Sequence, residues 1–271
     1  MGLPFNFYIF LRDTSLVIFS WFLLSISFFS WGKLLRKILN IEITGKKGVV
    51  ATIWLGFVFC IIFFSVYHLF LPINVLASSV FYIPSIIYFF VKYGKKLPAF
   101  FSSIGLFKII VIILTLYAAS AVAIQFPSNL DTGLYHLNSI RWLNEYHIIK
   151  GLGNLHAKLG FNQLFFIYSS SLNFHPFFND YAFHIGNSFL YFILFIGCIF
   201  SGTVIDLLII CLFFFIPMPF KWISCPTPDI ASTIVQLVTF RYLVEIIFFN
   251  PDSKERSSYI GLVAICFIDY L

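Results

Sequence analysis

Charged residues are scarce in this chain. Asp, Glu, Lys and Arg make up only 10% of its 271 residues, whereas 60% are hydrophobic. Soluble domains typically carry about 25% charged residues. A chain so poor in charge cannot cover the apolar surface of its own core in water, which excludes a water-soluble globular protein. The sequence therefore predicts that a lipid bilayer is the partner of most of its surface.

Paired cysteines and nucleic-acid motifs are absent as well. The five cysteines are scattered, mostly inside apolar segments, and contain no CxxC pair. Neither a cysteine zinc site nor a disulfide framework is indicated. The net charge of +6 comes from short basic clusters between apolar segments, with no motif that reads nucleic acid. We therefore expect no nucleic-acid partner.

Long apolar segments are what the chain does contain. Stretches of roughly 17 to 25 apolar residues can cross a bilayer as helices. The candidates are 14–31, 49–71, 73–91, 104–124, 179–200, 203–217, 229–249 and a last one that begins at 258. Between Lys47 and Lys92 there is no Asp, Glu, Lys or Arg, and Leu71-Pro72-Ile73-Asn74 is the only plausible turn in that run. The sequence thus predicts an all-α, polytopic bundle at the cell membrane, with residues 1–271 forming one transmembrane domain.

Basic loops predict the orientation of this bundle. One cluster follows the first candidate span and another follows the third; they comprise Lys33, Arg36, Lys37, Lys46 and Lys47, and then Lys92, Lys95 and Lys96. Such clusters are typical of cytoplasmic loops. The fourth span then delivers residues 126–162 to the outer face. The final apolar segment stops before a full span is complete, so we expect this chain to be the N-terminal part of a longer protein.

The stretch 161–178 is ambiguous. If it crossed the membrane, basic residues of a later loop would lie on the outer face, whereas basic residues are typical of cytoplasmic loops. Its serines, asparagines and glutamine also make it a poor lipid-facing segment. We interpret it as an interfacial or re-entrant helix covered by protein. The loop 217–228 then shares the outer face with residues 126–162.

Residues 126–162 form a polar island between apolar flanks. The island gathers Asp131, His136, Arg141, Glu145, His147, Lys150, His156 and Lys158. Within it, 132–147 has helical spacing, with Asn138, Arg141 and Glu145 on one stripe and apolar residues on another side. The sequence predicts an amphipathic helix on the membrane surface.

Two carboxylates of the outer face have a double interpretation. Asp131 directly precedes the predicted interfacial helix, and Asp229 opens the span after the second outer loop. Each is either a helix N-cap or a carboxylate presented for chemistry at the membrane surface. Two such residues on one face favour chemistry more than either does alone.

Other polar residues of the island also keep alternatives open. Arg141 and Glu145, four residues apart, form a surface ion pair, or Arg141 grips a phosphate. Metal ligation by the island's histidines is a weaker alternative, because the spacing of His136, His147 and His156 matches no metal motif. The segment Gly151-Leu152-Gly153 is a turn between helices, or a weakly indicated phosphate loop.

Charges within the apolar segments are few. Asp206, Arg241 and Glu245 cost free energy in lipid unless protein surrounds them. Arg241 and Glu245 lie four residues apart, so we expect them to neutralise each other. In a transporter these residues would line the path, but the chain shows no internal repeats of the kind transporters have.

The motifs of the island resemble those of a family of uncharacterised bacterial polytopic membrane proteins. The matching residues are Asp131, Tyr135-His136, Arg141-Trp142, Glu145-Tyr146, Gly151-Leu152, Asn154-Leu155-His156, Gly160-Phe161-Asn162 and Pro226-Thr227-Pro228-Asp229. That family is similar in layout to the GT-C superfamily of membrane glycosyltransferases. The chain departs from GT-C enzymes in having four candidate spans before the acidic loop and no second acid beside Asp131.

The resemblance implies a function and a site. The chain would transfer a sugar from a polyprenyl-phosphate-linked donor during assembly of a cell-surface glycan. Asp131 would be the catalytic residue, acting as a base on the acceptor hydroxyl or orienting a divalent metal. Arg141 or Lys158 would contact the donor phosphate. The full set that we expect to bind substrate is His136, Arg141, Glu145, Asn154, His156, Lys158 and Asp229. The alternatives are a polymerase, ligase or flippase of lipid-linked glycans, and a transporter.

Overall fold

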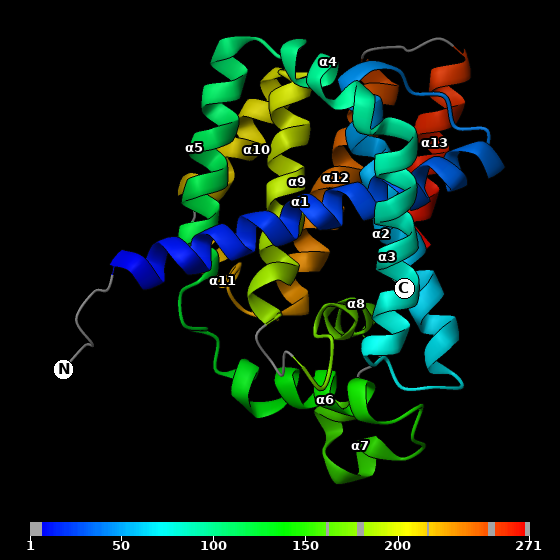
Figure 1. Cartoon of the computed structure of the whole chain (residues 1–271), viewed down its shortest axis with the longest axis vertical. Helices are drawn as coiled ribbons and strands as arrows, with labels where there is room; N and C mark the ends of the chain where they lie inside the picture. The colour runs from blue at the N-terminus through cyan, green and yellow to red at the C-terminus, as the bar shows by residue number, and fades with distance from the viewer. Residues whose placement is uncertain (1–6, 161–162, 178–181, 216, 249–252, 269–271) are drawn as a thin grey trace.

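The fold is all-α, as predicted. A computed structural model of the chain describes residues 7–160, 163–177, 182–215, 217–248 and 253–268, and every regular element in these ranges is helical. Six helical segments are long and apolar enough to cross a membrane (Figure 1). The protein is therefore a multi-pass membrane protein in its architecture.

The candidate spans alternate with short helices. The spans are α1 (Phe7–Ile38), α2 (Gly45–His68), α3 with its extension (Val75–Ser102), α5 (Leu106–Ala123), α9 (Phe183–Ser201) and α12 (Pro228–Phe248). The extension of α3 (Val75–Tyr93) comprises η1 (Gly94–Lys96) and α4 (Leu97–Ser102). The remaining helices are η2 (Thr132–His136), α6 (Leu137–Glu145), α7 (Leu152–Leu155), η3 (Ala157–Gly160), α8 (Leu164–Leu172), α10 (Val204–Phe215), α11 (Pro217–Trp222) and α13 (Ser253–Ile268).

One predicted span, 203–217, differs from the structure, and the last predicted segment is again incomplete. The stretch 203–217 contains α10, whose 12 residues extend about 18 Å, less than the thickness of a bilayer core. Helix α13, in the last predicted segment, has 16 residues. Neither is among the six candidate spans of the described residues. Helix α10 is apolar but short, which hydropathy alone does not reveal.

Glycines set the closest helix contact. Helices α1 and α2 pack against each other, and a Cβ atom at Gly56 would overlap the backbone of Phe28, as one at Gly32 would overlap that of Thr52. Small residues that let backbones meet are the usual means of packing helices in lipid. Helix α1 crosses the other spans obliquely (Figure 1). Its 32 residues exceed the length needed to cross upright, and tilting accommodates such excess.

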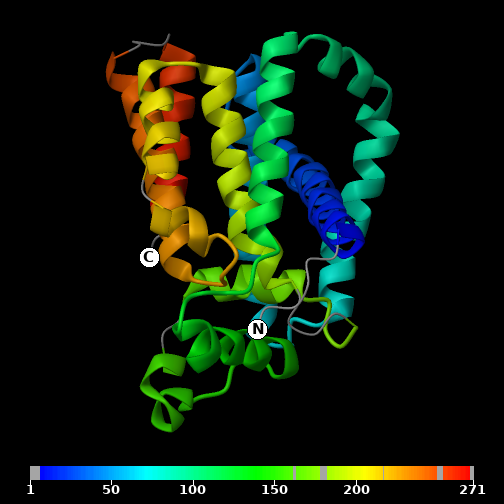
Figure 2. The ribbon, with the colours of Figure 1, turned by 90° about the vertical axis from the view of Figure 1, so that its left-hand side faces the viewer.

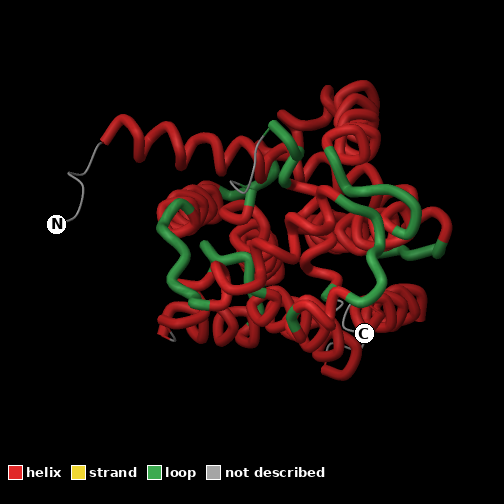
Figure 3. Tube along the Cα trace, turned by 90° about the horizontal axis from the view of Figure 1, so that it is seen from below, coloured by secondary structure: helices red, strands yellow, loops and turns green. Residues whose placement is uncertain are grey.

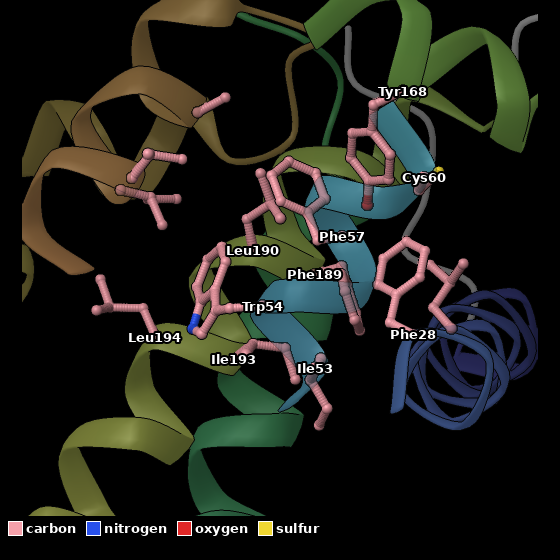
Figure 4. Close-up of a cluster of buried hydrophobic side chains, with 14 of the residues drawn as sticks. Phe28, Ile53, Trp54, Phe57, Cys60, Tyr168, Phe189, Leu190, Ile193 and Leu194 are labelled. Carbon is pink, nitrogen blue, oxygen red and sulfur yellow. The ribbon is translucent and has the colours of Figure 1, made fainter. Parts of the chain in front are cut away.

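Aromatic side chains form the core around the short helix α8. Phe57 of α2 meets Tyr168 of α8 edge-to-face, with ring centroids 5.0 Å apart, and Phe28 and Phe189 pack beside them (Figure 4). Helix α8 has nine residues, eight of them buried, so it is too short to cross a bilayer and is covered by protein. It runs across the base of the bundle (Figure 2). The prediction that 161–178 does not span agrees with this helix, although 161–162 and 178 lie outside the described residues.

The charges within the spans pair differently from the prediction. Arg241 does not neutralise Glu245. Instead, Arg241 Nε donates to Asp206 Oδ1 at 2.6 Å, and Lys47 Nζ donates to Glu245 Oε1 at 2.7 Å. Thr203 also donates to Asp206 Oδ2 through both its backbone N–H and its hydroxyl. The predicted pairing was wrong because it considered one helix only, whereas the tertiary fold brings oppositely charged side chains from other helices.

The two ends of the bundle differ in chemistry. Helix α4 and its neighbouring basic residues lie at one end, and the island helices α6 and α7 lie at the other (Figure 1). Figure 3 looks at the molecule from the island end, where helices and loops alternate. The fold thus separates the basic loops from the polar island by the length of the spans.

Candidate functional site

The island helix begins with a π-helical turn. Residues Thr132–His136 form this turn, and the Leu137 N–H donates to the Thr132 carbonyl across five residues. Such turns occur frequently at functional sites. Asp131 occupies the N-cap position, but its side chain makes no capping hydrogen bond. The side chain of Asn129 bonds the start of the helix instead, because its Oδ1 accepts from the Asp131 N–H at 2.9 Å.

Asp131 is instead half of an ion pair. Lys158 Nζ, from η3, donates to Asp131 Oδ1 at 2.8 Å. The same ammonium lies 4.7 Å from the centroid of the Tyr135 ring, a cation–π distance. The side chains of Lys158 and Asp131 are 39% and 37% exposed, so water and solutes reach both. The pair occupies only one oxygen of the carboxylate in the described part of the chain.

His136 lies next to this pair and is buried. Its side chain is among the least exposed of the island, and its Nδ1 has no hydrogen-bond partner among the described residues. Its ring packs against Phe166 of α8 at 5.6 Å between centroids. Burial lowers the pKa of His136 to about 4, although the negative charges of Asp131 and Asp229 oppose the shift. The imidazole is therefore neutral at physiological pH.

The charge of Asp229 affects the pKa of Tyr135 as well as that of His136. Burial raises the pKa of Tyr135, and the charges of Asp131 and Asp229 both raise it further. Asp229 is exposed and is the second residue of α12, so it is not the residue before the helix that an N-cap must be. Its Oδ2 accepts from the Thr227 hydroxyl at 3.2 Å. The two outer carboxylates of the sequence prediction thus flank the same tyrosine and histidine.

Buried amides fix these segments to the bundle. Asn187 of α9 donates to the carbonyls of Cys225 and Thr227 at 2.8 and 2.7 Å, which positions the loop before Asp229. Asn144 of α6 donates to the carbonyls of Ile73 and Ser170 at 2.6 and 2.9 Å. Sequence reasoning missed both asparagines, because a lone amide gives no pattern.

The glycine turn lines a cavity of about 350 Å³. Phe166, which touches His136, forms part of its wall. Three polar side chains are among its lining residues: His68, Ser139 and Gln163. No Asp, Glu, Lys or Arg lines the cavity. His68, a single histidine in a long uncharged run, was the signal in the sequence that could have indicated it.

The other predicted site residues lie on the exposed surface. Arg141 and Glu145 are both exposed on α6. Asn154 and His156 are also exposed, and their backbone N–H groups close the turn by donating to Gly151 and Leu152. Residues 161–162 of the predicted motif lie outside the described residues.

The glycines of the island serve the turn. Gly151 has a φ of +88°, the left-handed region that favours glycine. Gly153 and Gly160 pack against each other, since a Cβ at Gly153 would meet the Gly160 Cα at 3.5 Å. This geometry agrees with the interpretation as a turn between helices.

The donor set does not fit a metal ion. Among the described residues, no group of three or more His, Cys, Asp or Glu side chains is placed to hold one. The predicted alternative of ligation by His136, His147 and His156 is therefore wrong, since His136 is buried while the other two are exposed. A lysine ammonium already lies against Asp131. The predicted role of Asp131 in orienting a divalent metal has no support in this geometry.

Comparison with known proteins identifies the family of this chain. No curated protein and no solved structure matches it. One family model matches residues 15–268, which includes the six spans almost entirely, the island and the loop before Asp229. The chain belongs to that family, which is described as a domain of unknown function (DUF8201).

Proposed function

We propose that the protein is a membrane glycosyltransferase that uses a polyprenyl-phosphate-linked sugar. The observation that carries the proposal is the half-exposed Asp131–Lys158 pair. A carboxylate that can accept a proton lies beside a cation that can bind a phosphate, at the end of the bundle opposite the basic loops (Figure 1). This end faces outward if the basic loops are cytoplasmic.

The chemistry needs only the groups of this cluster. An acceptor hydroxyl gives its proton to Asp131, and its oxygen attacks the anomeric carbon of the donor sugar. The bond between that carbon and the phosphate oxygen breaks, and polyprenyl phosphate leaves with the electron pair. Lys158, on its flexible side chain, moves to the phosphate and stabilises its charge. No metal takes part in this sequence.

The neighbouring cavity supports a sugar as the ligand. Its lining includes the polar side chains of His68, Ser139 and Gln163. Hydroxyl groups both donate and accept, so a sugar can bond to such side chains whichever tautomer His68 adopts. The absence of charged lining residues favours a neutral, hydroxyl-rich ring. A cavity of about 350 Å³ lies within the size range of small-molecule sites.

The buried charges do not favour transport. Asp206 is bonded to Arg241, and Glu245 to Lys47. Charges that satisfy each other offer a solute no binding group along the spans. We therefore favour a transferase over a transporter.

The test is sugar transfer in membranes that contain the protein. The donors are polyprenyl-phosphate glucose and polyprenyl-phosphate mannose, labelled in the sugar. We expect label to leave the donor in the presence of the wild-type chain, Asp131→Asn to abolish this transfer, and EDTA to leave it unchanged. Glu42→Gln is the control, since it removes an exposed carboxylate outside the island.

Two results would count against the proposal. Transfer by Asp131→Asn at the wild-type rate would remove Asp131 from the chemistry. Consumption of pyrophosphate-linked oligosaccharides alone would favour the polymerase, ligase or flippase.

A further inference from the structure

A second cavity lies among the spans, away from the island. It has a volume of about 800 Å³ and is lined by residues of α1, α2, α3, α5 and α9 and of the α4 segment. Helix α4 arches from α3 to α5 over one end of it, with α1 passing beneath (Figure 2). The cavity is therefore open between helices and closed by α4 at the end opposite the island.

The walls of this cavity are apolar. Aromatic and aliphatic side chains make up most of the lining, and the aromatic ones include Phe22, Phe29, Phe89, Phe100 and Phe192. No Asp or Glu is part of the lining. A hydrocarbon chain is the ligand that suits such a surface, because its burial needs no hydrogen bonds.

Positive charge is confined to the α4 end. Lys33 and Lys96 are the charged residues of the lining, and no described carboxylate forms an ion pair with either. Lys92 and Arg36 lie close enough to add to the positive potential at Lys33. Arg36 donates its hydrogen bonds to backbone carbonyls and to Thr52, whereas the ammonium of Lys33 lies over the Phe29 ring, 5.5 Å from its centroid. The two lysines therefore present uncompensated charge at the mouth of an apolar cavity.

We propose that this cavity is a binding site for an anionic phospholipid of the leaflet at the basic end of the bundle. Its acyl chains fill the apolar cavity, and its phosphate lies between Lys33 and Lys96. Basic pockets between spanning helices bind anionic headgroups in this way. A free phosphate would leave the apolar walls uncovered. The site is distinct from the proposed transferase site, because its charged end lies opposite the island (Figure 1).

The proposal goes beyond the transferase and stands without it. A polyprenyl phosphate whose phosphate lay at Lys33 would hold its sugar at the wrong end of the bundle for Asp131. The lipid in this cavity is therefore a structural or regulatory ligand. Its binding is measured without any activity assay.

The experiment uses the full chain in vesicles of phosphatidylcholine mixed with phosphatidylglycerol. The protein is extracted in nanodiscs or mild detergent, and native mass spectrometry counts the lipids that remain bound. We expect phosphatidylglycerol to be enriched over its share of the vesicle. Lys33→Gln combined with Lys96→Gln should reduce that enrichment by roughly tenfold.

Two further variants keep the result decisive. Lys37→Gln with Lys95→Gln removes the same charge from exposed positions outside the cavity, and should retain the enrichment. Ile112→Trp fills part of the cavity while leaving both lysines, and should release the lipid. Equal losses in the two double-lysine variants, no enrichment in the wild-type chain, or bound phosphatidylglycerol unaffected by Ile112→Trp would each overturn the proposal.

Discussion

Two ion pairs of this protein have nearly the same geometry and different surroundings. The Arg241–Asp206 pair joins nitrogen and oxygen at 2.6 Å, and the Lys158–Asp131 pair does so at 2.8 Å. The first pair is 7% and 1% exposed, and the second is 39% and 37% exposed. Breaking a buried pair leaves a charge stranded, whereas an exposed pair contributes little to stability. The difference indicates that the first holds the bundle together and that the second is available for chemistry.

The polar groups around the two pairs also differ in how completely they are hydrogen-bonded. The carboxylate of Asp206 accepts from Thr203 as well, and Arg241 donates to the Gly197 carbonyl, so the buried pair is satisfied. Next to Asp131 lie the buried His136 Nδ1 and Thr132 Oγ1, which have no hydrogen-bond partner among the described residues. Native proteins leave few buried polar atoms unpaired, and those that exist call for an explanation. A ligand at the island would supply it.

Breaking the buried pair should have the largest effect. We expect Arg241→Met to lower the free energy of unfolding by about 3 to 5 kcal/mol, because Asp206 then keeps its charge in an apolar setting. Thermal unfolding in detergent measures this loss. The double variant Asp206→Leu with Arg241→Met is the control, and should recover much of it. Equal melting temperatures for wild type and Arg241→Met would contradict a structural role.

The second prediction concerns pH and the island. The folded pKa of His136, about 4, lies below the value of about 6.5 that it has when unfolded. The unfolded chain therefore binds more protons between these values, so stability is full above about pH 6.5 and falls as the pH drops towards 4. The loss amounts to about 3 kcal/mol in the limit of low pH. Between about pH 7.5 and 4.5, the melting temperature of His136→Gln should fall less steeply than that of His156→Gln, which changes an exposed histidine. The difference should arise within the window from roughly pH 6.5 to 4, where His136 loses its stabilising effect. The same slope in both variants would remove His136 from the account.

The exposed pair should show the smallest effect on stability. Lys158→Met leaves Asp131 in contact with water, so its melting temperature should match the wild type within the scatter of replicates. Transfer of sugar, in contrast, should be lost. A clear drop in melting temperature would show that this pair, like the buried one, serves the fold.

Much of the fold could be predicted from the sequence because length and charge decide it. The turn at Leu71-Pro72-Ile73-Asn74 separates α2 from α3 as expected, and Asn74 caps α3 by accepting from the N–H groups of Leu76 and Ala77. The interfacial stripe of α6 is exposed as its spacing indicated. These features depend on residues close together in the chain. Local pattern is sufficient for them.

The rest depends on contacts between distant residues. The pairs Arg241–Asp206 and Lys47–Glu245 are separated by 35 and 198 positions, so helical spacing could not reveal them. Of the residues predicted for the site, Asp131, His136, Lys158 and Asp229 lie near one another, whereas Arg141 and the glycine turn are exposed. The missed cavity depends on His68, Ser139 and Gln163, which come from three segments and share no motif.

The central claim is that the Asp131–Lys158 pair takes part in the reaction, whereas the Arg241–Asp206 pair stabilises the fold. Exchanging the charges tests it most directly, in a chain that carries Asp131→Lys and Lys158→Asp together. An exchanged pair can still attract, so we predict a wild-type melting temperature. The carboxylate then lies at the wrong position for the acceptor hydroxyl, so we predict no sugar transfer. Transfer at the wild-type rate by the exchanged chain would contradict the account.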